Sequence, residues 1–191
     1  MIKHLKPALI LFLALSVLTG VVYPLVVTVL AQAIFPEKAE GSLLTDGKGK
    51  IMGSELIGQQ FSEPRYFWGR PSATSPNAYN AAASSGSNLG TNNPALVDAV
   101  KTRIDALKAV DFDNKTSIPV DLITSSGSGL DPHISIAAAN YQINRVAKAR
   151  HVSPEKLRAL IDENTESRQL GFLGEPRVNV LKLNLVLDAS E

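Results

Sequence analysis

The sequence contains no cysteine among its 191 residues. Disulfides, thiolate metal sites and cysteine nucleophiles are therefore excluded. Charge is also scarce near the start, because all 18 acidic residues follow Phe35 and only Lys3 and Lys6 supply basic charge before it. Residues 37–191 carry 17 basic and 18 acidic residues, a net charge of −1. Nucleic-acid binding requires a cationic surface, so nucleic-acid partners are excluded.

A long run near the start has no charge at all. The thirty residues from Pro7 to Pro36 are rich in Leu, Val, Ile and Ala. As a helix this run reaches about 45 Å, whereas a bilayer core needs only about 20 residues. Residues 1–36 are therefore predicted to form a cytoplasmic N-terminus and one transmembrane helix.

Pro24 lies inside this run. It removes one backbone hydrogen bond and is expected to kink or interrupt the helix. Small residues such as Gly20 suit a helix that packs against other membrane helices. We therefore select Gly20, Tyr23 and Pro24 as candidate packing residues.

The charges that flank the run predict its orientation. Lys3 and Lys6 precede it, whereas the charges just beyond it are balanced. The positive-inside rule then places the N-terminus in the cytoplasm and residues 37–191 outside it. A cleaved signal peptide is the alternative, since Ala31-Gln32-Ala33 fits a cleavage site, but apolar regions of signal peptides span only about 7–15 residues. A retained anchor is the prediction.

Strand and helix signals alternate in residues 37–191. Two short apolar stretches flank Asp46-Gly47-Lys48-Gly49 and predict a β-hairpin. Alternating apolar residues predict strands over 118–124 and 178–187. Three helices share one start signal, a capping residue followed by proline. They begin at Asn93-Pro94, Asp131-Pro132 and Ser153-Pro154. The predicted fold class is α+β, with a single N-terminal transmembrane helix followed by a mixed α/β extracytoplasmic domain.

Residues 69–94 form a stretch of unusual composition. Twenty-three of these 26 residues are Gly, Pro, Ser, Thr, Asn or Ala, and Arg70 is the only charged one. Disordered segments tend to be highly charged, whereas short polar side chains bond back to the backbone in turns. An ordered loop is therefore predicted. The aromatic residues of Phe61–Trp68 precede it, and they either fill the core or form a contact surface.

Catalytic signals are weak. Ser125–Gly129 lacks the spacing and the lysine of a phosphate-binding loop, so a tight turn is predicted there. Ser128, Asp131 and His133 have the residue types of a catalytic triad, but no G-x-S-x-G motif accompanies them. The three histidines are too far apart in sequence to suggest a metal site. No catalytic residue, metal ligand or directly bound cofactor is predicted.

Several blocks of residues, in order along the chain, are typical of one family. They are Gly20–Leu25, Gly53–Gln59, Tyr66–Ala73, Gly86–Leu89, Asn93-Pro94, Ser128–Asp131, Gln142, Arg145–Arg150, Val178–Val180 and Leu183–Leu185. Over essentially its whole length the chain resembles the C subunit of the Kdp-type potassium-transporting P-type ATPase.

This resemblance implies a non-catalytic subunit of a high-affinity, ATP-driven potassium uptake pump in the bacterial inner membrane. The implied partners are a channel-like potassium-binding subunit, a P-type ATP-hydrolysing subunit and a small accessory peptide, so ATP and potassium ion are handled by the complex. The family's C subunit is described as aiding assembly and as a catalytic chaperone that raises the affinity for ATP. ATP is cytoplasmic, so an outer domain is expected to act allosterically.

Six residues are selected as a candidate partner surface: Tyr66, Phe67, Arg70, Asn80, Asn88 and Asp131. Two other functions stay open. One is a membrane-anchored exported hydrolase that uses the Ser/Gly-rich loop, and the other is an anchored domain that binds a solute or the cell envelope. Turnover by the isolated domain would support the hydrolase. Co-purification with large membrane proteins would support the pump subunit.

Overall fold

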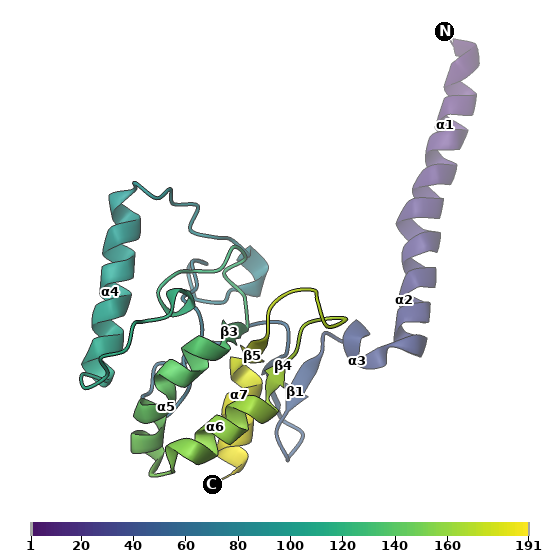
Figure 1. Cartoon of the computed structure of the whole chain (residues 1–191). Coiled ribbons are helices and arrows are strands. Elements are labelled where there is room, and N and C mark those ends of the chain that lie inside the picture. The colour runs from purple at the N-terminus through teal and green to yellow at the C-terminus, as the bar shows by residue number, and fades with distance from the viewer. Residues whose placement is uncertain (1, 191) are drawn as a thin grey trace. The chain divides into compact units, whose positions relative to one another are not determined.

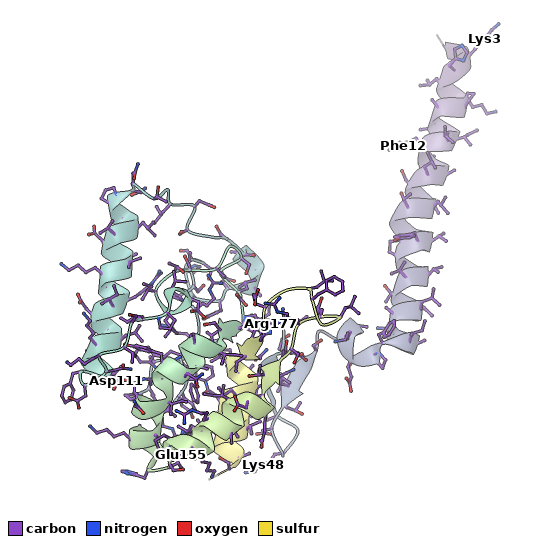
Figure 2. All side chains as sticks on the ribbon, in the orientation of Figure 1. Lys3, Phe12, Lys48, Asp111, Glu155 and Arg177 are labelled. Atoms are coloured by element: carbon purple, nitrogen blue, oxygen red, sulfur yellow. The ribbon has the colours of Figure 1, made fainter. Side chains whose placement is uncertain are left out.

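The computed structural model describes residues 2–190, and the chain divides into two compact units after Leu43. The first unit contains α1 (Ile2–Val17), the π-helical turn η1 (Leu18–Val22), α2 (Tyr23–Ile34) and the short α3 (Pro36–Ala39). Lys3–Ile34 run as one apolar helix of 32 residues. Its side chains project outward on all sides, as Phe12 does in Figure 2. The helix is long and apolar enough to cross a membrane, as predicted.

The expected disturbance around Pro24 takes the form of a π-helical turn. Pro24 lies in the first turn of α2, directly after η1. The Tyr23 N–H donates to the carbonyl of Leu18, five residues earlier. A π-helical turn widens the helix locally, so the helix continues past a residue that has no N–H to donate.

The second unit, from Leu44 onward, is a mixed α/β domain, in agreement with the predicted fold class. Its helices are α4 (Pro94–Val110), α5 (Ile136–Arg150), α6 (Pro154–Glu163) and α7 (Val180–Ala189), with 3-10 turns η2 (Ala81–Ala83) and η3 (Val120–Leu122). The expected hairpin is β1 (Leu43–Thr45) with β2 (Ile51–Ser54). A three-stranded antiparallel sheet has the order β3 (His133–Ser135), β5 (Arg177–Asn179), β4 (Thr165–Glu166).

The helix starts at Asn93-Pro94 and Ser153-Pro154 are confirmed, and both capping side chains accept from the first turn. The start at Asp131-Pro132 is wrong, because residues 133–135 form β3 and α5 begins at Ile136. Asp131 accepts instead from the N–H of His133, and Ser135 caps the helix. Pairing of β3 with β5 outweighs the local start signal.

Both predicted strands need correction. Residues 118–124 contain the 3-10 turn η3 rather than a strand, and this turn begins after Pro119. Of residues 178–187, only the first two belong to β5, and the rest form α7. The buried residues there, Val180, Leu181, Leu183, Asn184 and Leu187, follow helical spacing. Alternating leucines fit both patterns. Burial against α6 and the sheet selects the helix, and Asn179 caps its first turn by accepting from the Lys182 N–H.

The core of this domain lies among α5, α6, α7 and the sheet. Helix α6 contacts both α5 and α7, and α5 and α7 each contact β5 (Figure 1). Helix α4, teal in Figure 1, contributes one buried residue, Leu107. The largest apolar side chains in the core are Phe67, Ile143, Val146, Leu157, Ile161, Val178, Leu183 and Leu187. Phe67 comes from the aromatic segment, so that segment passes through the core.

Candidate functional site: a charged cluster at the end of the aromatic segment

Two buried amide side chains clamp the aromatic segment in place. Asn184 of α7 accepts from the N–H of Phe67 and donates to its carbonyl, both at 2.9 Å. Gln142 of α5 does the same for Trp68, at 2.8 and 3.1 Å. Each amide thus takes the place of a neighbouring strand and satisfies backbone groups that burial would otherwise leave without partners.

Arg145 of α5 holds the preceding turn. Its guanidinium donates to the carbonyls of Pro64 and Tyr66 at 2.5 and 3.0 Å and to Gln142 Oε1 at 2.6 Å. It also lies over the Trp68 ring, 4.7 Å from the centroid. Burial lowers the pKa of Arg145 to about 10, so the side chain remains a cation at neutral pH.

Two guanidinium groups lie against the ring of Tyr66. Arg65 and Arg150 each lie 5.0 Å from its ring centroid, and its hydroxyl donates to Asp188 at 3.2 Å. Arg150 pairs with the same carboxylate at 2.6 Å. These contacts bind the aromatic segment to the ends of α5 and α7.

Arg70 follows the aromatic segment by two residues and belongs to a charged cluster. Arg70 pairs with Asp131 at 3.2 Å and donates to the carbonyl of Ser125 at 3.3 Å. His133 lies between two carboxylates, with Nδ1 3.4 Å from Asp131 and Nε2 3.6 Å from Glu166. Glu166 also pairs with Arg177 at 3.0 Å, so the cluster extends across the sheet from β3 to β4 and β5.

Asp131 links the loop to the sheet through its charge. Burial raises the pKa of Asp131, but hydrogen bonds from His133 and the charge of Arg70 outweigh this effect, so the pKa lies below its usual value. An acid with a depressed pKa stabilises the folded state above its unfolded-state pKa, and this stabilisation is lost as the pH falls through the folded-state pKa.

Replacing Asp131 with asparagine is therefore expected to lower the free energy of unfolding by about 1 kcal/mol at neutral pH. The difference from wild type should begin to shrink as the pH falls below the unfolded-state pKa of about 4, and it should vanish below the lower folded-state pKa, where the wild-type carboxylate is neutral in both states. Urea unfolding of both proteins from pH 7 to about pH 2.5 measures it. A difference that stays constant across this range would show that the charge of Asp131 is not responsible.

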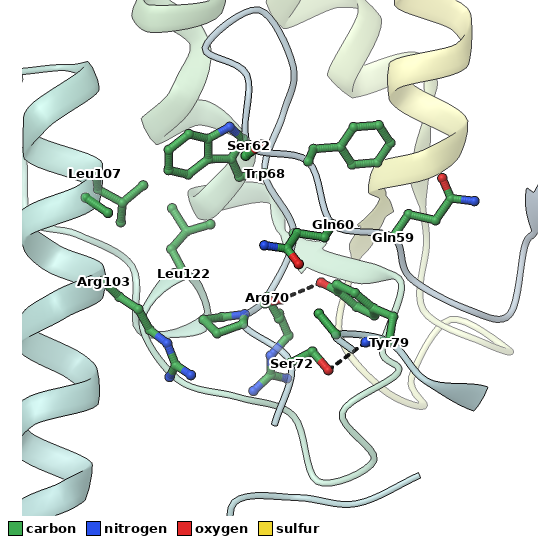
Figure 3. Close-up of a pocket in the computed structure, with 15 residues that line it drawn as sticks. Gln59, Gln60, Ser62, Trp68, Arg70, Ser72, Tyr79, Arg103, Leu107 and Leu122 are labelled. Carbon is green, nitrogen blue, oxygen red and sulfur yellow. Dashed lines mark hydrogen bonds between the residues drawn. The ribbon is translucent and has the colours of Figure 1, made fainter. Parts of the chain in front are cut away.

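Two cavities adjoin Arg70. The first has a volume of about 390 Å³ and lies between residues 59–72 and the inner face of α4. Figure 3 shows Trp68, Leu107 and Leu122 on one side of it and Tyr79 directed toward Arg70 on the other. The Tyr79 hydroxyl donates to the Arg70 carbonyl, and burial together with the charge of Asp131 raises its pKa to about 12. The second cavity, of about 640 Å³, contains Arg70, Asp131 and His133 in its wall.

Comparison with known proteins decides the family. The sequence matches the family model for KdpC, described as the c chain of K⁺-transporting ATPase, over residues 5–189. It is 61% identical over 189 residues to the potassium-transporting ATPase KdpC subunit of Methylococcus capsulatus, with 99% of each chain covered. The KdpC subunit of Dechloromonas aromatica is 62% identical over 185 residues, which cover 97% of this chain and 96% of that one. The chain belongs to the KdpC family. The resemblance found in the sequence is thereby confirmed.

The candidate partner residues of this KdpC-family chain occupy different environments. Arg70 and Asp131 form one ion pair, and Tyr66 is partly exposed in its stack. Phe67 is fully buried, so it belongs to the core and its placement on an outer surface is corrected. Asn80 caps η2 by accepting from Ala82 N–H. Asn88 is exposed and has a left-handed backbone with φ of 53°, which asparagine adopts more readily than most residues.

The Ser/Gly-rich stretch 125–129 packs against the loop at residues 69–94 and forms hydrogen bonds with it. Ser72 Oγ donates to the Gly129 carbonyl at 2.7 Å, and the N–H of Ser85 donates to the Ser128 carbonyl at 3.0 Å. A Cβ on Gly86 would lie 2.8 Å from the Gly127 carbonyl oxygen, so glycine permits this close approach. The stretch therefore anchors residues 72–86 beside the charged cluster.

The candidate packing residues in the helix are open to a neighbour. Tyr23 is 66% exposed, and no atom lies within 4 Å of the position that a Cβ on Gly20 would occupy. Pro24 is also exposed. Thr19 bonds back to the carbonyl of Leu15 at 2.7 Å, so its polar hydroxyl is satisfied within the helix.

Sequence reasoning assigned no role to Gln142, Arg145 or Asn184, although these three residues position the site. The sequence feature that could have identified them is a polar residue at a position where the helical pattern of apolar residues predicts burial. In α5 and α7 such positions are visible only once the helices are known. Among residues 2–190, no group of three or more His, Asp or Glu side chains is arranged to hold a metal ion.

Proposed function

We propose that this chain is the accessory C subunit of an ATP-driven potassium pump. The family match carries this proposal, because it spans both the apolar helix and the folded domain, from residue 5 to residue 189. The pump's other subunits, as the resemblance implies, are a channel-like potassium-binding subunit, a P-type ATP-hydrolysing subunit and a small accessory peptide. ATP and potassium are then handled mainly by those partners.

The chain crosses the bacterial inner membrane once in this proposal. Lys3 and Lys6 lie at the cytoplasmic end of the span, and the domain lies outside the cytoplasm. The domain promotes assembly and use of ATP by the hydrolytic subunit from the outer face. This effect passes through membrane helices, because ATP is bound on the opposite side, and it is therefore allosteric.

The geometry favours this non-catalytic role over an exported hydrolase. Ser128 Oγ accepts from the N–H of Leu130 and lies 3.5 Å from Ser126 Oγ. It therefore belongs to the turn at residues 125–129, against which the loop at residues 69–94 packs. His133 engages Asp131 and Glu166. A nucleophile needs a base within hydrogen-bond reach, and among the described residues no hydrogen bond joins Ser128 to His133.

Co-purification tests the proposal. The full chain, tagged at its C-terminus and produced with the pump subunits encoded in the same bacterium, is extracted in mild detergent, and its companions are identified by mass spectrometry. We expect a P-type ATPase and a polytopic potassium-binding protein. A chain that purifies alone and hydrolyses ester or phosphate substrates would support the hydrolase instead.

Protease accessibility tests the orientation separately. Protease added to spheroplasts, in which the inner membrane is intact and the outer membrane open, should digest residues 44–191 and leave a short fragment that contains the span. A cytoplasmic protein serves as the control for intact membranes. Protection of the domain until the membrane is dissolved would reverse the proposed orientation without affecting membership in the pump.

A further inference from the structure

The loop that joins β4 to β5 places apolar side chains in solvent. Leu170 is 83% exposed, Phe172 69% and Leu173 47%. Residues 169–174 contain no charge. The loop projects away from α5 and α6, which cover the core (Figure 1). Three large apolar side chains at one exposed tip mark a contact site rather than a solvated turn.

Backbone hydrogen bonds within the tip define the shape of its turn. Gln169 and Leu173 exchange two backbone hydrogen bonds of 2.9 Å, and the N–H of Phe172 donates to the Gln169 carbonyl at 3.2 Å. An ordered turn loses little conformational freedom when it binds. The tip, defined as residues 169–174, is therefore suited to enter a pocket of fixed shape.

Leu170 is also an unusual choice for its backbone. Its φ is 53°, in the left-handed region, and Gly171 beside it has φ of 81°. Glycine and asparagine adopt this region readily, whereas leucine rarely does. Leucine at this position neither stabilises the left-handed turn nor interacts favourably with water. Burial of the Leu170 side chain by a binding partner would be favourable, and it would account for a leucine at this position.

The charges around the tip favour a protein over a lipid surface. Arg168 pairs with Glu175 at 2.5 Å, and Arg177 pairs with Glu166 at 3.0 Å. Surface binding to anionic lipid depends on basic side chains beside the apolar ones, and in this hairpin both arginines are neutralised by their own carboxylates. A neutral, apolar tip with a hydrogen-bonded turn fits an apolar pocket in a protein.

We propose that the tip at residues 169–174 docks into an apolar pocket on the outer surface of a membrane-embedded subunit of the same pump. Only residues 35–43 separate the apolar helix from the domain, a reach of about 30 Å when fully extended. The start of the domain can therefore lie no farther than this from the end of the helix. This inference rests on the proposed function.

Photo-crosslinking in the co-purified complex tests the docking. Phe172 is replaced by p-benzoyl-phenylalanine, which retains the aromatic ring, and the complex is irradiated in native membranes. We expect one adduct with a membrane-embedded pump subunit. The same replacement at Val97, which is 60% exposed on α4, is the matched control and should give little adduct. An adduct with lipid, an adduct with a second copy of this chain, or no adduct would overturn the inference.

A double variant supplies a second measurement that does not depend on crosslinking. Leu170→Asn with Phe172→Asn removes the apolar side chains, and asparagine suits the left-handed turn, so the domain should keep its thermal stability. The amount of partner retained after a stringent detergent wash should fall by about ten-fold or more. Val97→Gln is the control and should retain the partner.

The outcomes separate this inference from the proposed function. If the wild-type chain purifies alone, both fail. If the wild-type chain and the double variant retain the pump subunits equally, the docking site is wrong while the chain remains a pump subunit.

Discussion

Replacing Arg145 with alanine is expected to lower the free energy of unfolding of the domain by about 3–5 kcal/mol. The side chain is 4% exposed, and three acceptors depend on it: the carbonyls of Pro64 and Tyr66 and the Gln142 side chain. Truncation leaves the carbonyls of Pro64 and Tyr66 without this donor, reduces Gln142 Oε1 to its bond from the Trp68 N–H, and opens a cavity beside the Trp68 ring. Chemical denaturation of the full chain in detergent, followed by Trp68 fluorescence, measures the loss.

Two further variants separate the causes. Asn144→Ala removes an exposed neighbour on the same helix, and its effect should stay within about 0.5 kcal/mol. Arg145→Lys keeps the charge but lacks the planar fork that reaches several acceptors at once, so an intermediate loss is expected. If lysine restored full stability, charge alone would account for the role of Arg145.

Replacing Asn184 with alanine should lower the free energy of unfolding by about 2–4 kcal/mol, because both the N–H and the carbonyl of buried Phe67 lose their hydrogen-bond partner. These two bonds join residues that lie 117 positions apart. The aromatic segment should loosen, and hydrogen exchange at Phe67 and Trp68 should rise more than exchange within α6. Val186→Ala, at a position 40% exposed on the same helix, is the control and should have a small effect.

The variant Asn184→Asp tests whether hydrogen bonding, and not side-chain volume, is responsible. The new carboxylate would still accept from the Phe67 N–H, but in its ionised form it could not donate to the Phe67 carbonyl. Burial raises the pKa of such a group, so this variant should gain stability as the pH falls and the protonated acid becomes a donor. A loss of stability that does not depend on pH would argue against the amide clamp.

The predicted loss of stability extends to function through Arg70. The clamps on Phe67 and Trp68 fix the backbone that leads into Arg70, and Arg70 in turn joins the loop to Asp131. Loosening the clamps should therefore weaken any contact made by the charged cluster or by loop 69–94. Fully buried Phe67 would then affect such a contact only indirectly, through the position of Arg70.

Sequence reasoning was most successful where a signal is local. The run from Pro7 to Pro36 is long enough to cross a bilayer whatever surrounds it, because its length and its lack of charge are properties of the chain alone. The caps at Asn93 and Ser153 act on backbone groups two or three residues away, and both helices begin where predicted. The family could also be recognised from short blocks of residues, which the full-length match then confirmed.

The tertiary structure decided what depends on distant partners. Asp131-Pro132 carries the same start signal as the correct sites, yet pairing of His133–Ser135 with Arg177–Asn179 made those residues a strand. The leucines after Val180 fit a strand or a helix, and burial against α6 and the sheet selected the helix. Asn184, Gln142 and Arg145 gain their roles only when α5 and α7 meet the aromatic segment. A local pattern sets the conformation of a few residues, whereas the burial of a polar group and its satisfaction are set by residues far along the chain.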